Sequence, residues 1–518
     1  MRWDESGLDR EQIVLFPERL DEALSDDHVV RLLDEVLSQL DWKPWEAAYK
    51  NTDRGRPPIH PRVLAGVLLY GLLVGVRSSR LLEAALCDRM DFRWLAQDRR
   101  IDHTTLCKFR RDHPQALSHL FAQVALVAAQ AKLSPLARMA FDGTKIKANN
   151  QRFRNLTPAQ LQQLEAELTA RFAELEAQAQ AEDLAAAERS RLEEELQDTR
   201  RRTTQIQGAL QELARLQAAG EKLPPTIPLT DPESRISPNK QGGFAANHTP
   251  VAGVDVDSGV MVTQDVIAGT AEEHHLEAAV KDVHETYDAQ LEEVLADGLF
   301  STGANMKALD DEHVTLYSPL INFSENNPAV RDDLTAPVPA EKWSDLPTRK
   351  VKGGDSKLDK AAFVYDASED CYYCPQGKRL GRFKTTTDHR EDETVIKRTR
   401  YLADEADCAE CPLKSLCVTG KAPSRQVSRD QFESHRETHT ERMQTDEAKE
   451  KYARRRAVGE RPFAVIKQVF GARQFLLRGL QRVRQEWAWL ASAFNLKLLL
   501  TTLRARAGPS SSDDCIHP

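Results

Sequence analysis

The spacing of apolar residues changes along the chain, and this change constrains the fold more than any other feature of the sequence. Apolar residues recur three and four positions apart in the N-terminal quarter, which is the pattern of helices with one buried face. The predicted helices cover 29–40, 61–76, 81–95 and 106–131. Around Ala140 to Ile146 apolar and polar residues alternate instead, which predicts a β-strand. An all-α N-terminal domain, residues 1–132, therefore precedes a region that contains a sheet.

Further changes of pattern follow this strand. Residues 155–220 return to helical spacing with few helix breakers, which predicts a helical hairpin or coiled arm with a structural or oligomerising role. Strands are predicted at 249–256 and 259–267, then a helix over 272–289, and then a strand that ends near Asp297. The β-α-β order indicates an α/β core, and open α/β sheets bind ligands outside the carboxyl ends of their strands.

The distribution of charge bears on the partner of the chain. Its net charge of −9 argues by itself against nucleic acid, because binding to phosphates needs Lys and Arg. The segment from Lys451 to Gly508, however, holds thirteen Lys and Arg against two Glu, whereas the arm is acidic. A local DNA-binding surface in the C-terminal region is compatible with this asymmetry, and a merely solvated basic face is the alternative.

The N-terminal segment and the apolar runs bear on the compartment. The first twelve residues, MRWDESGLDREQ, are polar, and the longest apolar run, Val63 to Val76, is short for a bilayer span. We therefore expect neither secretion nor contact with a membrane. The crowding of five of the eight cysteines into 371–417 indicates a reducing cytoplasm instead.

Three acidic residues have neighbours that suit catalysis. Asp142 lies within AFDGTKIKAN, Asp297 within LADGLFS, and Glu460 within RRRAVGERPFAVIKQVFG. Converging carboxylates suit phosphodiester chemistry, because two Mg²⁺ ions need several carboxylate oxygens and open positions for water and phosphate. Gly459 and Pro462 bracket Glu460, so we expect this acid at the start of a helix, with the helix amides near a bound phosphate.

Several cations are candidates for contact with DNA. In IDHTTLCKFRRDH, Thr104 or Thr105 is a candidate N-cap of a short basic helix. Arg456, Glu460 and Lys467 are spaced so that they share one helical stripe. The basic stretch 473–484 is expected to follow the DNA backbone beside the active site. The residues predicted to contact DNA are Lys108, Arg110, Arg111, Arg456, Lys467, Arg473 and Arg478.

Five of the eight cysteines lie close together in sequence. Two CxxC pairs are typical of a closed, structural zinc site, because four thiolates complete a tetrahedron. Reduced cysteines packed in a core are the alternative. The candidate ligands are Cys371, Cys374, Cys408, Cys411 and Cys417.

The pattern around the third acid resembles that of bacterial insertion-sequence transposases of the DDE type, which have an RNase H-like catalytic fold. Their signature of Tyr, Arg, Glu and Lys appears here as Tyr452, Arg456, Glu460 and Lys467, with the tyrosine one residue further from the arginine than usual. The segments RPPIHPRVLAGVLLYGLL, DPESRISPNKQGGF and GARQFLLRGL extend the likeness over most of the chain.

This resemblance implies the chemistry of the site. It implies that Asp142, Asp297 and Glu460 bind Mg²⁺ or Mn²⁺ while water, and then a DNA 3′-hydroxyl, attacks phosphorus. It further implies double-stranded DNA, both element ends and target, as partner, a homodimer on that DNA, and a place at the bacterial nucleoid. A metal-dependent nuclease without strand transfer, an inactivated DNA-binding remnant and a coiled-coil scaffold with a zinc module stay open as alternatives.

The predicted fold is an α/β RNase H-like core, a mixed sheet flanked by helices, with an N-terminal helical domain and two insertions. The core would consist of 133–154, 221–322 and 421–508. The helical arm, 155–220, and a Cys-rich segment, 323–420, would interrupt it, and 323–360 is expected to be an exposed connection. Residues 509–518 are expected to be a disordered tail.

Overall fold

Two compact units make up the computed structural model of the chain. The large unit consists of Met1–Gln217, Lys222–Glu292 and Arg454–Pro518, and the small unit consists of Ala218–Glu221 and Glu293–Ala453. The N-terminal helices share the large unit with strands and with the C-terminal helix. The predicted tail, 509–518, lies outside the described residues. The structure describes 19–49, 58–132, 134–151, 154–180, 186–239, 242–269, 271–319, 326–351, 355–389, 395–420 and 422–507.

The N-terminal part of the large unit is helical, as the apolar spacing predicts. Two predicted helices are each divided in the structure: the first at Arg89, whose backbone is extended, and the second at His113, which precedes a proline that disfavours helical backbone before it. No helix among the described residues combines the length and the apolar character needed to cross a membrane. The helices are α1 (Val29–Ser38), α2 (Lys43–Glu46), α3 (Pro61–Leu73), α4 (Ser79–Asp88), α5 (Met90–Leu95), α6 (His103–Asp112) and α7 (Pro114–Ala131), after the short 3-10 helix η1 (Leu20–Ala23).

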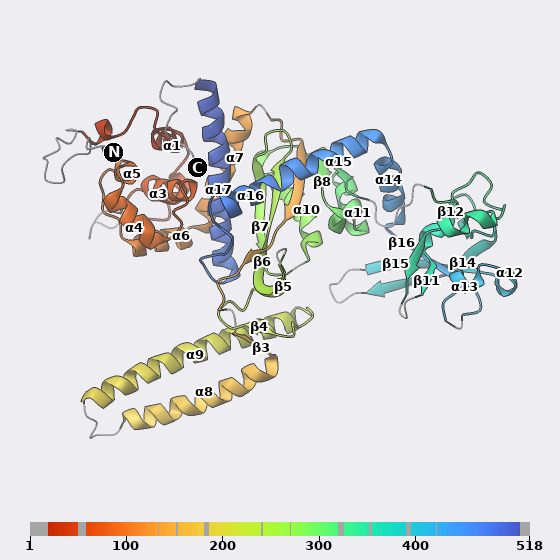
Figure 1. Cartoon of the computed structure of the whole chain (residues 1–518), viewed down its shortest axis with the longest axis horizontal. Coiled ribbons are helices and arrows are strands. Elements are labelled where there is room, and N and C mark those ends of the chain that lie inside the picture. Colours follow the sequence, from red (N-terminus) through yellow and green to blue (C-terminus); the bar gives the residue numbers. More distant parts are fainter. Residues whose placement is uncertain are drawn as a thin grey trace, which may run out of the picture. The chain divides into compact units, whose positions relative to one another are not determined.

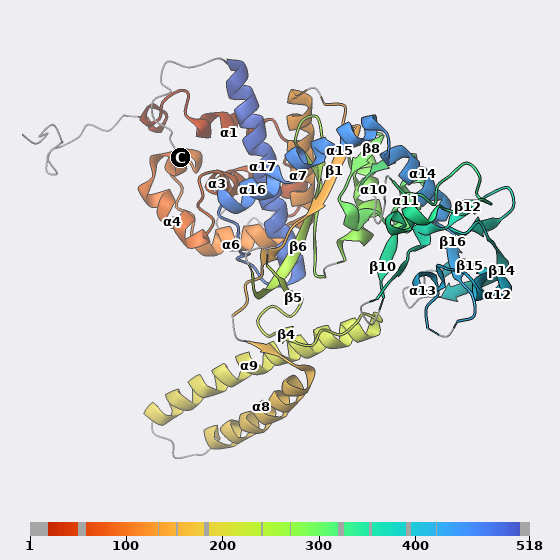
Figure 2. The same ribbon diagram turned by 45° about the vertical axis from the view of Figure 1, so that its right-hand side comes forward.

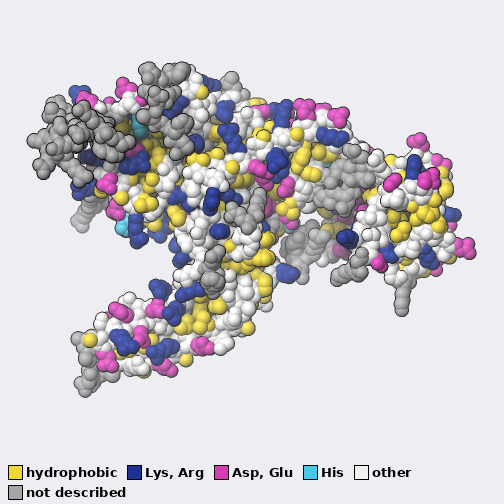
Figure 3. Space-filling model, in the orientation of Figure 1, with side chains coloured by type: hydrophobic (Ala, Val, Ile, Leu, Met, Phe, Trp, Pro, Cys, Tyr) yellow, Lys and Arg dark blue, Asp and Glu magenta, His cyan; other side chains and the backbone are white. Residues whose placement is uncertain are grey.

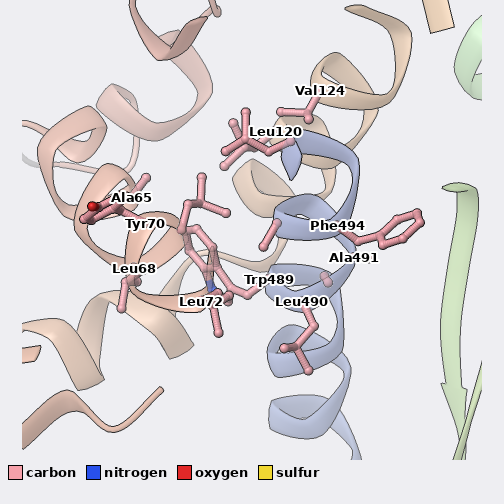
Figure 4. Close-up of a cluster of buried hydrophobic side chains, with 14 of the residues drawn as sticks. Ala65, Leu68, Tyr70, Leu72, Leu120, Val124, Trp489, Leu490, Ala491 and Phe494 are labelled. Atoms are coloured by element: carbon pink, nitrogen blue, oxygen red, sulfur yellow. The ribbon is translucent and has the colours of Figure 1, made fainter. Parts of the chain in front are cut away.

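The last helix, α17 (Leu480–Ala507), is buried on all sides over most of its length, and it joins the helical block to the sheet. Its side chains Trp489 and Leu490 point toward α3 and α7, whereas Phe494 points to the other side (Figure 4). On that side the amide of Asn495 accepts a hydrogen bond from the backbone N–H of Met261 and donates one to its carbonyl, both at 2.8 Å. This pair of bonds fixes α17 to an edge of the sheet.

The sheet of the large unit is built around its longest strand, β6 (Phe244–Asp255). One half of β6 pairs with β2 (Ile146–Lys147) and β5 (Arg235–Pro238), and the other half with β1 (Arg138–Gly143) and β7 (Met261–Ile267), all antiparallel. The predicted strand around residue 140 and the predicted hairpin of β6 and β7 are both present.

A helix and a projecting arm complete the large unit. After the 3-10 helix η2 (Glu272–His275), α10 (Leu276–Tyr287) packs on β7. The arm consists of α8 (Pro158–Ala179) and α9 (Ala186–Ala218), which lie side by side in Figures 1 and 2. A two-stranded ribbon of β3 (Asn155–Leu156) and β4 (Ile227–Pro228) closes its base.

Inside the arm, a short apolar core and ion pairs hold the two helices together. Leu161 of α8 packs with Ile206 and Leu213 of α9, and Arg171 pairs with Glu195 at 3.2 Å. Charged side chains of both signs cover the arm around a line of apolar ones (Figure 3). The helical hairpin predicted from the spacing is therefore present.

The small unit begins with a parallel strand pair, β8 (Glu293–Leu295) and β9 (Thr315–Tyr317), joined by the 3-10 helix η3 (Gly298–Phe300) and α11 (Gly303–Asp311). This is the predicted order of strand, loop and helix around Asp297. The unit also contains a hairpin of β10 (Thr348–Lys350) and β11 (Ser356–Leu358) and a five-stranded antiparallel sheet. That sheet runs in the order β12 (Val364–Asp366), β13 (Cys371–Tyr373), β14 (Arg379–His389), β15 (Val395–Ala403) and β16 (Gln426–Asp430).

The remaining helices of the small unit are short or lead back to the large unit. They are η4 (Ala340–Asp345), η5 (Lys360–Ala362), α12 (Glu405–Ala409), α13 (Lys414–Cys417) and α14 (Glu433–Met443). The helix α15 (Asp446–Gly459) starts in the small unit and ends in the large one, where α16 (Arg461–Gln468) follows.

The expectation that 323–360 is an exposed connection is wrong. Ala329, Leu346 and Leu358 are at most 3% exposed and belong to the same apolar core as Tyr372 and Tyr401 of the five-stranded sheet. The segment is rich in Pro, Asp and Lys, but its few apolar side chains supply part of this small core. Its described residues are therefore part of the folded small unit.

Candidate active site

Asp142 lies near the end of β1, opposite Ala252 of β6. Its carboxylate accepts a hydrogen bond from the Gly143 amide at 2.8 Å, and its other oxygen lies 3.2 Å from the Arg455 guanidinium. Both side chains of this ion pair are less than 15% exposed, so water screens it only in part. The strand thus presents one carboxylate with its charge already balanced by a cation from α15.

The arginine beside Asp142 is not the one that the sequence pattern predicted. Arg456 was placed in the pattern of Tyr, Arg, Glu and Lys, but its side chain is exposed, and Arg455 makes the contact with Asp142. Because three arginines follow one another at 454–456, the sequence does not show which of them contacts Asp142. Arg455 has the usual spacing to Tyr452 but lies one residue further from Glu460 than Arg456 does, so spacing alone does not choose between the two arginines.

Close backbone approach shapes the surroundings of Asp142. A Cβ atom on Gly459, the last residue of α15, would lie 3.8 Å from the Cβ of Asp142, so this turn of helix passes directly over the strand. A Cβ atom on Gly143 would overlap the carboxylate of Glu272. Glu272 therefore lies against the residue that follows Asp142, and nothing in the sequence singled it out beforehand.

Lys467 is the second cation beside β1. Its ammonium group donates a hydrogen bond to the hydroxyl of Thr144 at 2.5 Å, two residues after Asp142. Thr144 is 7% exposed, and Lys467 is half-buried. The structure therefore brings Lys467 and Asp142 to the same end of β1, which the spacing of the sequence pattern alone does not establish.

Glu460 occupies the break between α15 and α16. It stands at the N-cap position of α16, with Pro462 in the first turn, as the flanking Gly and Pro residues predicted. The predicted single stripe of Arg456, Glu460 and Lys467 is wrong, because α15 ends at Gly459 and a new helix starts at Arg461. The Glu460 side chain is exposed.

Asp297 belongs to the small unit, two residues beyond the end of β8. Its carboxylate accepts a hydrogen bond from the Leu299 amide at 2.9 Å and caps the short helix η3. It thus lies at the carboxyl end of a parallel strand, where ligands bind in open α/β sheets. Asp142 and Glu460 belong to the large unit, and the convergence of all three acids stays a prediction.

The basic helix near residue 105 is α6, and its cations do not share one role. The N-cap is Asp102, which accepts a hydrogen bond from the Thr105 amide at 2.8 Å, rather than Thr104 or Thr105. Lys108 is exposed, and Arg111 is half-buried.

Arg110 is half-buried, and its guanidinium bonds within the helical block. It donates a hydrogen bond to the Arg77 carbonyl at 2.9 Å, and burial lowers the pKa of its guanidinium while the nearby Glu486 opposes that shift. Glu486 itself forms an ion pair with Arg77 at 2.8 Å. Arg110 is therefore enclosed with these groups inside the helical block.

The basic stretch 473–484 is only partly available for DNA. Arg473 is exposed, but Arg478 donates to the Asn149 carbonyl at 2.8 Å, and Arg484 pairs with Asp265 at 2.8 Å. Arg478 therefore helps to hold the loop before α17, and Arg484 helps to hold the start of α17, against neighbouring segments.

Four of the five clustered cysteines lie close together. Burial raises the pKa of the Cys417 thiol to about 12, and the thiols of Cys374, Cys408 and Cys411 add to the shift. Cys374 also accepts a hydrogen bond from the Lys378 amide at 3.3 Å. Cys371 instead interacts with Tyr373 and Arg379 next to it, and it is buried.

Among the described residues, no group of three or more His, Cys, Asp or Glu side chains is arranged so that it could hold a metal ion. The acids around β1 and the cysteines of the small unit are among these residues. Near β1, the guanidinium of Arg455 lies against the carboxylate of Asp142, and the Glu460 side chain is exposed.

Comparison with known protein families adds independent evidence. Residues 18–112 match the family model described as Transposase domain (DUF772), and residues 373–500 match the one described as Transposase DDE domain. The second match includes Glu460, Arg455 and Lys467, and it leaves Asp142 and Asp297 outside. No curated protein and no solved structure matches the chain.

These two matches, on two parts of a chain with a mixed α/β fold, support a transposase, and the DDE domain implies a nucleic-acid-processing enzyme. Within this class the two matches support an insertion-sequence transposase of the DDE type, which confirms the resemblance drawn from the sequence. Such a protein has DNA as its substrate, and its family generally uses divalent metal ions.

Proposed function

We propose that this protein cleaves DNA at the ends of an insertion sequence and joins the released 3′-ends to a target, with Asp142, Asp297 and Glu460 as its catalytic acids. The observation that carries the proposal is the ion pair of Asp142 in β1 with Arg455 of α15, beside Thr144, to which Lys467 of α16 bonds. Phosphoryl transfer needs charge neutralisation and positioning more than covalent participation of the protein, and this end of β1 provides both.

The residues around Asp142 have distinct roles in this proposal. Arg455 holds the carboxylate in place and balances its charge until substrate arrives. Lys467 bonds to Thr144, two residues after Asp142, and offers an ammonium group to a DNA phosphate. The exposed cations Arg456 and Arg473 would extend the contact along the backbone, and each phosphate contact releases bound counterions from DNA.

Dependence on Mg²⁺ or Mn²⁺ is part of the proposal. Such ions, when bound, would reduce the charge repulsion at the scissile phosphate. Arg455 would have to turn aside for an ion to reach Asp142, because its guanidinium lies 3.2 Å from the carboxylate. We further propose an RNase H-like core, a dimer that brings two element ends together, and action on the DNA of the bacterial nucleoid.

The proposal is tested with the full chain and a DNA fragment that carries its own gene with flanking sequence, since the element ends are unknown. With Mg²⁺ we expect cleavage in the flanks and products joined to a target plasmid. Asp142→Asn, Asp297→Asn and Glu460→Gln should each lose both activities. The matched control is Asp257→Asn, which removes a partner of Arg138 at the opposite end of β1 and should retain activity.

The outcomes separate the candidate functions. Cleavage without joined product would identify a nuclease instead. DNA binding without any cleavage would identify an inactive remnant. Wild-type cleavage in all three acid variants would remove these acids from the mechanism.

A structural zinc ion in the small unit stays a separate proposal, because the arrangement described does not close a metal site. It is supported by the mutual proximity of Cys374, Cys408, Cys411 and Cys417, and thiolates at such spacing are the usual ligands of structural zinc. Metal analysis of the purified chain tests it. We expect zinc in the wild type and in Cys371→Ala, and its loss in Cys374→Ala; absence of zinc from the wild type contradicts the proposal.

A further inference from the structure

The strands β14 and β15 form a long hairpin with an unusual excess of cations. The described residues of these two strands include Arg379, Arg382, Lys384, Lys397, Arg398 and Arg400, against the single acid Asp388. The core of the small unit packs on one face of this sheet, through Leu380, Tyr401 and Val427. The opposite face is not part of that core.

Two cations lie directly opposite each other on that second face. Lys384 pairs in register with Arg400, which in turn pairs with Ser428 of β16. Neither Lys384 nor Arg400 makes an ion pair with any of the residues that the structure describes, whereas Arg398 has Asp388 at 3.3 Å and Arg382 has Asp370 at 3.3 Å. Like charges directly opposite each other destabilise a strand pair, so an anion between them would relieve the repulsion.

A bulge adds an exposed aromatic ring beside this pair. The register of β14 and β15 shifts between Arg382 and Lys384, and Phe383 between them is 64% exposed. The shift also reverses the alternation of the strand, so that Lys384 lies on the solvent face although Arg382, two residues earlier, lies on the core side. The bulge therefore places an exposed ring directly before Lys384 in the strand.

We infer that the face formed by Lys384, Arg400 and Ser428 binds the sugar–phosphate backbone of duplex DNA, at a second contact separate from the residues around Asp142. The two cations are spaced as a cross-strand pair, and a hydroxyl completes the row across three strands. A two-stranded ribbon can follow a groove of the double helix, and phosphate contacts by Lys and Arg supply affinity independent of sequence. This inference rests on the proposed function, because it takes DNA as the substrate.

The test measures the binding of the full chain to a fluorescent duplex of arbitrary sequence over a range of salt concentrations. Each phosphate contact contributes about 0.9 to the slope of log affinity against log salt. We expect Lys384→Gln and Arg400→Gln each to lower the slope by about that amount, and the double variant to lower it by about twice as much. Their melting temperatures should not fall, because each substitution removes one member of a like-charged pair.

The matched control is Lys397→Gln, an exposed lysine of β15 that lies on the other face of the hairpin and has Thr387 opposite it. Its slope should equal that of the wild type. An unchanged slope in the double variant, or an equal fall in Lys397→Gln, would overturn the inference. The inference would also be overturned if the double variant lost binding to single-stranded DNA while its salt slope for duplex DNA stayed unchanged.

The same experiment distinguishes this inference from the proposed function. If the wild-type chain binds no duplex under any salt condition, the proposed function fails and the inference fails with it. If the wild type binds and cleaves DNA but the hairpin variants bind as it does, only the second contact is refuted.

Discussion

Asn495 provides the sharpest test of how the C-terminal helix is fixed to the sheet. Its side-chain amide makes two hydrogen bonds of 2.8 Å with the backbone of Met261, and both residues are fully buried. In Asn495→Ala the N–H and the C=O of Met261 lose these partners in a place that water does not reach. Each buried backbone group without a partner costs about 1–3 kcal/mol, so the free energy of unfolding should fall by about 2–6 kcal/mol.

Urea denaturation of the full chain, followed by tryptophan fluorescence, measures this loss. Trp487 and Trp489 lie in the same helix, are at most 2% exposed, and report on its environment directly. The control is Thr501→Ala in the same helix, which removes only a hydroxyl that bonds to the Lys497 carbonyl one turn away, and it should change stability by less than about 0.5 kcal/mol. A loss in Asn495→Ala no larger than that of the control would falsify the idea that this amide anchors α17.

Three further predictions concern single residues. Gly377 has a φ of +71°, and a Cβ atom on it would overlap a backbone carbonyl, so Gly377→Ala should lower the free energy of unfolding of the small unit, measured in urea, by at least about 2 kcal/mol. A Cβ atom on Gly381 would contact no other atom, so Gly381→Ala should not lower it. Arg455→Ala should slow DNA cleavage more than about tenfold and Arg456→Ala less than about twofold; equal effects would contradict the assignment. Burial lowers the pKa of His439 in the folded chain, so below about pH 6.5 this histidine is protonated more in the unfolded chain than in the folded one. The free energy of unfolding should therefore fall as the pH drops below about 6.5, and it should level off once the histidine is protonated in both states. His439→Asn should remove this dependence in urea titrations at successive pH values, and an unaltered profile would assign it to other groups.

Much of the secondary structure could be predicted because local patterns determine it. The helices of the N-terminal block, the two helices of the arm, and β1, β6 and β7 all lie where apolar spacing placed them. The small unit was harder, because its core has few apolar side chains, and these are spread through segments rich in Pro, Asp and Lys. Leu346 and Leu358 supply that core from a stretch whose average composition is that of a loop.

Exposure of charged side chains was the least predictable property. Arg110 and Lys108 stand two residues apart on α6, yet Arg110 is enclosed with Arg77 and Glu486, whereas Lys108 is exposed. The sequence of α6 carries no sign of this difference, because Arg77, which accepts the hydrogen bond of Arg110, and Glu486, which lies nearby, belong to other parts of the chain. Counting cations in a helix therefore predicts its charge but not which of them can reach a phosphate.

The neighbours of Asp142 show the same limit at the candidate site. Arg455, Gly459 and Lys467 lie more than three hundred positions away in the sequence, and each reaches β1 through a different part of α15 and α16. Helix α15 ends at Gly459 and α16 begins at Arg461, so Arg455 and Lys467 belong to two short helices, and Lys467 of α16 bonds to Thr144. The Gly and Pro residues around Glu460 thus do more than mark a helix start, because they allow one short segment to supply both cations at the end of β1.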